Sequence, residues 1–218
     1  MYSQPGALIV IDMQRDFLEQ GGYAATTGMD VTALRRPISS IRKLLDHARS
    51  CGMLIIHTRE GHRPDLSDCP PAKLARSRHA GAEIGSAGPL GRLLVRGEYG
   101  HDIIDELQPI SGEPIVDKPG YGAFHQTDLA QILGTHGIRS LLICGVTTEV
   151  CVHSTLRQAV DHGYRCVVIS DACGSAHQQL HDAALKMVGV EGGIFGTVAD
   201  TDTVLAQMKI SQGGGKQS

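Results

Sequence analysis

Tryptophan is absent from this chain of 218 residues, and aromatic side chains make up only 4% of it. Such a composition argues against the base-stacking surfaces that bind single-stranded nucleic acids. The formal net charge is −3, so no excess of basic residues indicates binding to nucleic acid or to an anionic membrane. We therefore expect no nucleic-acid partner and no membrane partner.

Long apolar runs are also missing. The longest span about five to seven residues, whereas a helix that crosses a bilayer needs roughly 20. The N-terminal stretch MYSQPGALIVIDMQ has no basic segment before its apolar run, so it does not resemble a secretory signal. The six cysteines include no C-x-x-C pair, which argues against a zinc ribbon and favours reduced thiols. We expect a cytoplasmic protein.

Short apolar runs alternate with helical patterns along the chain. The runs have the length and the branched residues of strands that are buried on both faces. The expected strands are 7–12, 53–60, 113–120, 140–146, 164–172 and 193–199, and the expected helices are 30–51, 126–137, 148–163, 177–190 and 201–209. This alternation predicts an α/β fold, a Rossmann-like three-layer α/β/α sandwich with a central, mainly parallel six-stranded sheet.

Residues 61–101 interrupt the alternation. The segment is long and rich in Gly, Pro and charged residues, which is typical of a lid or of a segment that contacts a partner. The tail at 211–218 is expected to be disordered. Because no repeat or change of composition marks a boundary, residues 1–218 are interpreted as one domain.

Three chemically distinct side chains follow strands that lie far apart in the sequence. Asp12 ends the first strand, Lys118 ends the strand at 113–120, and Cys151 lies in the first turn of the helix after 140–146. Reactive residues gather beyond the carboxyl ends of parallel strands, so we expect these three side chains to meet at one edge of the sheet.

An acid, an amine and a thiol together suit nucleophilic acyl transfer to water. The helix dipole and Lys118 would favour the Cys151 thiolate, and Asp12 could take the thiol proton and return it to a leaving amine. Each residue also has a structural interpretation. Cys151 could be a small buried hydrophobe, as Cys144 and Cys166 are expected to be, Asp12 a turn residue and Lys118 a surface charge.

Three segments carry a specific resemblance. ALIVIDMQRDFLEQGG, VDKPGYGAF and ICGVTTEVCVHSTLRQAVDHGYRCVVISDACGS are similar to the isochorismatase-like cysteine hydrolases, and the similarity covers nearly the whole chain. The resemblance implies that Asp12 is the acid/base, Lys118 the catalytic lysine and Cys151 the nucleophile. It also implies a cis peptide bond between Val146 and Thr147, with the amides of Thr147 and Cys151 as the oxyanion hole.

Within that family, GGYAATTGMDV, HTREGHRPDLSDCPPAK, RGEYGHDIIDEL and EGGIFGTV look most like the biuret hydrolase branch. The likeness implies an amidohydrolase that cleaves a C–N bond of a small ureido or carbamoyl amide, such as biuret or triuret, through a thioester. Glu191 stands where that branch has Gln, which puts biuret in question and leaves triuret or another ureido compound. The alternatives are a nicotinamidase-like enzyme and a non-catalytic member of the fold.

The resemblance implies no metal and no cofactor. Nicotinamidases of the family have an Asp-x-His pair in their metal site, but no Asp stands two residues before His57 here. His57 and His62 are therefore interpreted as solvated side chains. Relatives are often dimers or tetramers, which implies a homo-oligomer.

The expected substrate-binding residues lie near the ends of the predicted strands. Phe17 is expected to wall the site, and Arg59 and Glu60 to contact carbonyl and amide groups. The others could shape the site or have only structural roles. The full set is Phe17, Arg59, Glu60, Tyr121, Phe124 and Glu191.

Overall fold

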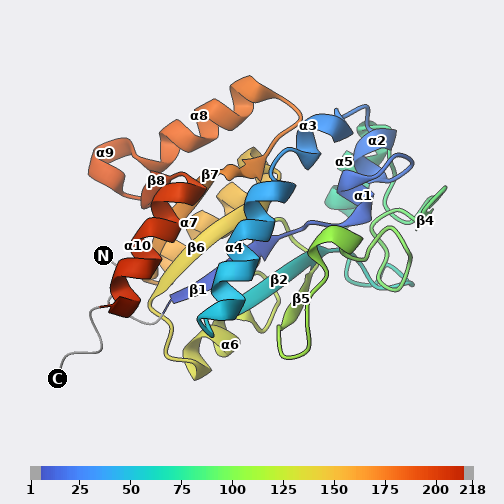
Figure 1. Cartoon of the computed structure of the whole chain (residues 1–218). Helices are drawn as coiled ribbons and strands as arrows, with labels where there is room; N and C mark the ends of the chain where they lie inside the picture. The colour runs from blue at the N-terminus through green and yellow to red at the C-terminus, as the bar shows by residue number, and fades with distance from the viewer. Residues whose placement is uncertain (1–5, 214–218) are drawn as a thin grey trace.

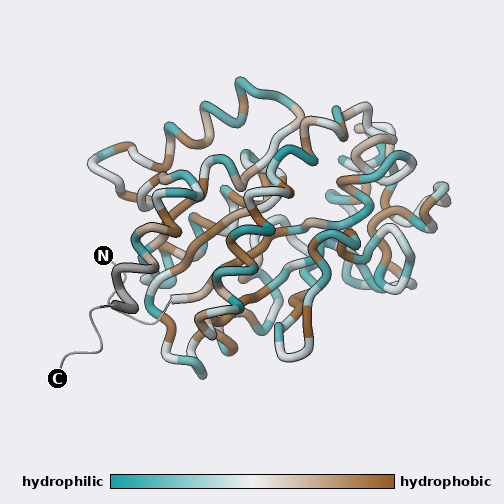
Figure 2. Tube along the Cα trace, in the orientation of Figure 1, coloured by the Kyte–Doolittle hydropathy of each residue, from teal (hydrophilic) through white to brown (hydrophobic). Residues whose placement is uncertain are grey.

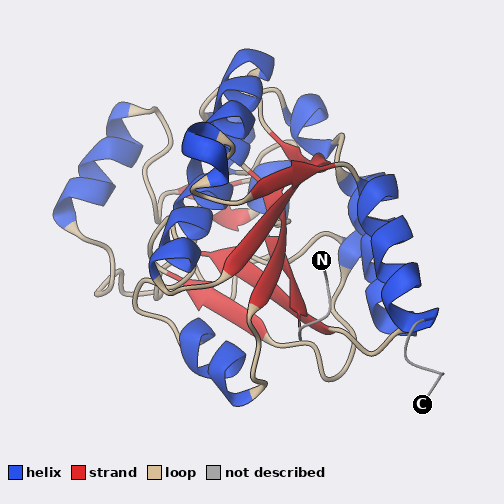
Figure 3. Cartoon of the chain, turned by 90° about the vertical axis from the view of Figure 1, so that its left-hand side faces the viewer, coloured by secondary structure: helices blue, strands red, loops and turns tan. Residues whose placement is uncertain are grey.

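The computed structural model describes residues 6–213, which form a six-stranded sheet between layers of helices (Figures 1 and 3). Neighbouring strands of this sheet are all parallel, in the order β5-β2-β1-β6-β7-β8, which confirms the expected α/β sandwich. The strands are β1 (Gly6–Ile11), β2 (Leu54–Glu60), β5 (Ile115–Lys118), β6 (Ser140–Val146), β7 (Arg165–Gly174) and β8 (Thr197–Ala199).

The central strands consist largely of apolar residues, as Figure 2 shows. Ile9 in β1 is paired with Ile56 in β2 and with Ile143 in β6, and all three side chains are fully buried. Burying each such side chain stabilises the fold by about 1.5–3 kcal/mol. This is why the continuous apolar runs of the sequence form central strands.

Helices cover both faces of the sheet. In Figures 1 and 3, α4 and α10 pack on one face and α6 and α7 on the other. The α-helices are α1 (Arg15–Leu18), α2 (Tyr23–Thr26), α3 (Val31–Arg35), α4 (Ile38–Ser50), α5 (Pro71–His79), α6 (Leu129–Thr135), α7 (His153–Asp161), α8 (Gln178–Val188), α9 (Val190–Gly193) and α10 (Thr201–Gly213). A 3₁₀-helix, η1 (Asp105–Leu107), and a π-helix, η2 (Thr148–Val152), complete the helices of the described residues.

Several expected elements differ from those observed. The strand predicted over 193–199 is shorter, because Gly193 ends α9 and β8 spans only Thr197–Ala199. The helix predicted over 30–51 is two helices, α3 and α4, because Pro37 lacks the amide that would continue the first one. The helix predicted over 148–163 begins as the π-helix η2. The expected disorder of 211–218 fails for residues 211–213, which continue α10, and residues 214–218 lie outside the described part of the chain.

Gly145 brings the carboxyl ends of β1 and β6 together. Its φ is 121°, and a Cβ at this position would lie 2.1 Å from the carbonyl oxygen of Ile11. Only glycine combines that conformation with so close an approach. The residues that follow the two strands, Asp12 and Thr147, are therefore held at the same edge of the sheet.

The segment 61–101 folds over this edge, at the right of Figure 1. It contains α5 and a small hairpin of β3 (Ala87–Gly88) and β4 (Gly91–Arg92). A bridge between His62 and Val95 closes it on itself. None of the helices in the described residues is both long and apolar enough to span a bilayer.

Candidate active site

Asp12 directly follows β1 and has a positive φ of 52°. Its carboxylate is fully buried, and its Oδ2 lies 2.7 Å from the Nζ of Lys118. Its Oδ1 accepts a hydrogen bond of 2.6 Å from the Thr58 hydroxyl, and its amide donates to the Thr58 carbonyl. Burial raises the pKa of Asp12 above its ordinary value, although Lys118 opposes the change.

Lys118 ends β5 and is completely buried. Besides Asp12, its Nζ lies 3.5 Å from Glu60 Oε2 and donates to the carbonyl of Gly120 at 3.0 Å. Burial acts to lower the pKa of this amine, but the neighbouring Asp12, Cys151 and Glu60 outweigh burial and raise it. The ammonium therefore stays charged and compensates the buried carboxylates.

Glu60 ends β2 and joins the segment 61–101 to the site. Its Oε1 lies 2.6 Å from the Nζ of Lys73 in α5, and its Oε2 accepts a hydrogen bond of 3.2 Å from the Cys151 thiol. Burial acts against its charge, but Lys118 and Lys73 together lower the pKa of Glu60 to about 2. Glu60 is thus an anion held between two ammonium groups.

Cys151 lies within η2, which begins just after β6. Its side chain is 4% exposed. Burial raises the pKa of its thiol well above the ordinary value, and Lys118 only partly offsets this effect. Lys118 acts in the expected direction, towards the thiolate, but desolvation outweighs it and the adjacent carboxylates also favour the protonated form.

Two carboxylates are thus available to the thiol, and they differ as proton acceptors. Glu60 accepts the S–H hydrogen bond, yet its pKa of about 2 makes it a weak base. Asp12 has a raised pKa, and its acceptor atoms lie within 4.8 Å of those of Glu60 and Cys151. Asp12 is therefore the better base, while Glu60 positions the thiol.

The peptide bond between Val146 and Thr147 is cis, as expected. Thr147 and Cys151 both line a cavity of about 250 Å³ at this edge of the sheet. The wall is largely apolar, with a few polar groups, and the volume suits a small ligand. The lining residues are Phe17, Tyr23, Met29, Glu60, Lys73, Arg76, Ser77, Ala80, Ile84, Leu94, Tyr121, Thr147, Val150 and Cys151.

Residues 6–203 match the family model described as the isochorismatase domain. The chain belongs to the isochorismatase family. It is 34% identical to the ureidoacrylate amidohydrolase RutB of Serratia proteamaculans (strain 568), over 92% of this chain and 81% of the relative. It is 33% identical to RutB of Yersinia enterocolitica, over 90% of this chain and 86% of the relative.

A solved cysteine hydrolase from Pseudomonas syringae pv. phaseolicola has the same fold, with a TM-score of 0.82 and 26% identity. The match covers 97% of this chain and 95% of that protein. The expected membership of the isochorismatase family is therefore confirmed.

Three residues expected to touch substrate in this isochorismatase-family chain do not line the cavity. Arg59 points away because side chains alternate along β2, and it binds Asp117 at 2.8 Å and Asp102 at 3.0 Å. Phe124 instead stacks on His162, with ring centroids 4.6 Å apart. Phe17, Glu60 and Tyr121 do line the cavity.

Glu191 is the third residue that was expected to touch substrate and does not line the cavity. It is exposed in α9, which precedes β8 and lies at the opposite side of Figure 1 from α1 and α5. The chain enters a parallel strand at its amino end, so α9 lies far from the carboxyl ends that carry the site. Within this chain, Glu191 cannot select between biuret and triuret.

The expected solvent exposure of the two histidines was also wrong. His57 and His62 are fully buried rather than solvated. His57 Nε2 lies 3.0 Å from Glu113, and His62 Nδ1 lies 3.2 Å from Asp68. Each imidazole thus has a carboxylate partner, which offsets its desolvation.

One group in the described residues has a possible metal-ligand geometry, and it consists of Asp12, Glu60 and Cys151. Lys118 contacts both carboxylates of this group, and Lys73 contacts one of them. Two ammonium groups already neutralise the two carboxylates. The donor set therefore fits a lysine-compensated thiol site better than a divalent cation.

Lys73 and Arg76 were missed by the sequence analysis. Both lie in α5, so the segment 61–101 covers the site of its own chain. The signal was the PPAKLARSRHA stretch, where two prolines precede a helical pattern. Because the segment as a whole resembled a loop, this short helix was not predicted.

Proposed function

We propose that this protein is a cysteine amidohydrolase that cleaves a C–N bond of a small ureido or carbamoyl amide. The observation that carries the proposal is the buried set of Asp12, Lys118 and Cys151 beside a small cavity. Amidohydrolase relatives at 33% and 34% identity support the same class of reaction. The substrate of those relatives, ureidoacrylate, contains the ureido group.

The reaction begins when Asp12 takes the proton of the Cys151 thiol and the sulfur attacks the ureido carbonyl carbon. The amides of Thr147 and Cys151 stabilise the oxyanion that forms. Lys118 keeps Asp12 charged before the transfer and compensates the charge on sulfur. The C–N bond then breaks, Asp12 protonates the leaving nitrogen, and a thioester remains on Cys151.

Water completes the cycle. Asp12, now ionised again, takes a proton from a water molecule that attacks the thioester carbon. The C–S bond breaks and the sulfur recovers a proton from Asp12. Glu60 has a second role in this proposal: as a pure acceptor, it receives N–H groups of the ureido end.

The test is ammonia release from equal concentrations of ureidoacrylate, biuret, triuret and nicotinamide. Cys151→Ser serves as the blank. We expect turnover of at least one ureido compound, at a rate well above that of nicotinamide and of the blank. Turnover of nicotinamide alone would contradict the substrate class, and an equally active Cys151→Ser variant would contradict the mechanism.

A further inference from the structure

Helix α5 presents one side to the cavity. Lys73, Arg76, Ser77 and Ala80 recur at helical spacing, and all four line it. The Nζ of Lys73 forms an ion pair with Glu60 Oε1 and donates a hydrogen bond to the carbonyl of Pro119, each at 2.6 Å. Arg76 brings a second positive charge to the same wall.

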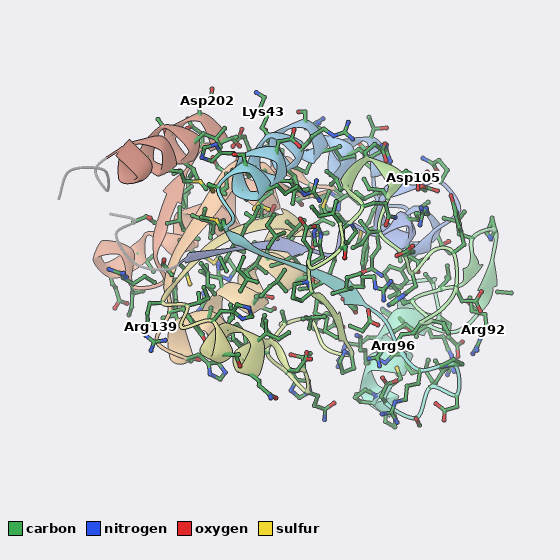
Figure 4. The ribbon with its side chains drawn as sticks, turned by 60° about the horizontal axis from the view of Figure 1, so that its bottom comes forward. Lys43, Arg92, Arg96, Asp105, Arg139 and Asp202 are labelled. Carbon is green, nitrogen blue, oxygen red and sulfur yellow. The ribbon has the colours of Figure 1, made fainter. Side chains whose placement is uncertain are left out.

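Arg76 is exposed, at the rim of the cavity, and its guanidinium has no hydrogen bond and no ion pair with the side chains that the structure describes in residues 6–208. Three other arginines of the segment 61–101 have partners, whereas the Arg63 side chain has none among the described residues and does not line the cavity. Arg78 pairs with Glu83 at 2.7 Å, and Arg96 pairs with Asp68 at 3.2 Å. Arg92, labelled with Arg96 at the right of Figure 4, donates to the carbonyls of Gly85 and Pro64. Arg76 is thus the arginine of this segment that lines the cavity, and no described side chain offers it an acceptor.

The charges around the cavity balance without Arg76. The carboxylates of Asp12 and Glu60 are matched by the ammonium groups of Lys118 and Lys73. Cys151 is protonated at rest because burial raises the pKa of its thiol. The exposed guanidinium therefore adds one positive charge at the rim of the cavity, and no side chain of the lining pairs with it.

We propose that Arg76 binds a carboxylate at the end of the substrate remote from the ureido carbonyl, so that the enzyme prefers ureido acids to neutral ureas. This inference rests on the proposed function and adds a substrate class to it. A guanidinium offers two parallel N–H donors, which match a carboxylate, and such charged hydrogen bonds are stronger than neutral ones. Biuret and triuret, which lack an anionic group, would be poor substrates.

A purely structural role makes a different prediction. Arg76 lies in the last turn of α5, where a positive charge stabilises the helix dipole. Loss of that effect would lower stability and would affect charged and neutral ligands equally. The charge of the ligand is therefore the variable that separates the two roles.

Binding to the Cys151→Ser protein tests the proposal without turnover. Ureidoacrylate and its methyl ester share the ureido end and differ in the charge of the other end. We expect the acid to bind more tightly, and Arg76→Met to weaken its binding by about 10- to 100-fold with less than about a threefold change for the ester. Arg78→Met, in the same helix but outside the cavity, is the matched control and should change neither, whereas Arg76→Lys should retain part of the preference.

Equal losses for acid and ester, or no preference for the acid, would overturn the role of Arg76. A second probe does not depend on the substrate. The rate of Cys151 alkylation by iodoacetate relative to iodoacetamide, normalised to the same ratio for glutathione, should fall by about threefold or more in Arg76→Met and not in Arg78→Met. An unchanged ratio overturns the inference even if ureido compounds are hydrolysed. A changed ratio without any ureido turnover supports the anion site and contradicts only the proposed function.

Discussion

Cys144 and Cys151 are two buried thiols of one segment with different surroundings. Cys144 lies within β6, is 0% exposed, and its thiol donates only to the carbonyl of Ile9, at 3.5 Å. Cys151 lies beyond the end of β6, is 4% exposed, and contacts Glu60 at 3.2 Å. Burial raises the pKa of both thiols. Burial therefore does not distinguish a nucleophile from a core residue. The distinction lies in Glu60 and Lys118, the charged side chains that other strands bring to Cys151.

The same contrast holds for two buried carboxylates. Asp12 has Lys118 at 2.7 Å, whereas Asp16, in α1, accepts a hydrogen bond from the Leu94 amide and has no ion pair within the described residues. Burial raises the pKa of Asp16 to about 6. A charge at Asp16 thus costs stability, whereas the charge at Asp12 belongs to a compensated set.

The largest expected effect separates the two cysteines. Cys151→Ala should lower kcat/KM by more than about 10³-fold, because no covalent intermediate can form. Cys144→Ala should leave kcat/KM within about threefold and lower the free energy of unfolding by about 1 kcal/mol, because it removes only packing. Steady-state assays and urea unfolding of both variants measure these changes. Comparable losses of activity would remove the distinction.

Lys118→Met should destabilise the fold strongly. The substitution leaves Asp12 and Glu60 buried with one ammonium instead of two, and breaking a buried charge pair costs about 3–5 kcal/mol. Lys43→Met, at an exposed position of α4 that is labelled in Figure 4, should change the free energy of unfolding by less than about 0.5 kcal/mol. Similar urea midpoints for the two variants would show that Lys118 does not compensate the carboxylates.

Asp16 should make stability depend on pH in a defined direction. Its pKa is about 6 in the folded protein and 3.8 ordinarily, so the folded state holds the proton more tightly. The resulting stabilisation is full below about pH 4 and is lost as the pH rises through 6, by up to about 3 kcal/mol. Asp16→Asn should remove this loss.

The readout is the free energy of unfolding of wild type minus that of Asp16→Asn, measured from pH 4 to pH 7. The exposed Asp202→Asn, labelled in Figure 4, controls for the amide substitution. A difference that does not fall with pH would show that Asp16 is not a strained buried acid.

Much of the fold could be predicted because apolar runs report burial directly. The central runs became β1 and β6, and the order of motifs placed Asp12, Lys118 and Cys151 at the ends of their strands. Chain topology alone determines which strand ends meet. The helix predicted over 30–51 failed at a single residue, Pro37, whose missing amide outweighed the surrounding periodicity.

The wall of the cavity was harder to predict because side-chain direction depends on register. Arg59 and Glu60 are adjacent, yet the alternation along β2 sends one to Asp117 and the other to Cys151. Lys73 reaches the site from a segment that resembles a loop in sequence. The desolvation that keeps the Cys151 thiol protonated depends on the packing of all these elements, which no local pattern reports.

The most direct measurement is the mass of the peptide that contains Cys151, after acid quench during turnover of a ureido substrate. Fragmentation separates Cys151 from Cys144, which lies earlier in the same segment. An acyl adduct on Cys151, with none on Cys144, is the predicted result. Accumulation of product while Cys151 remains unmodified at every quench time would contradict the thioester mechanism.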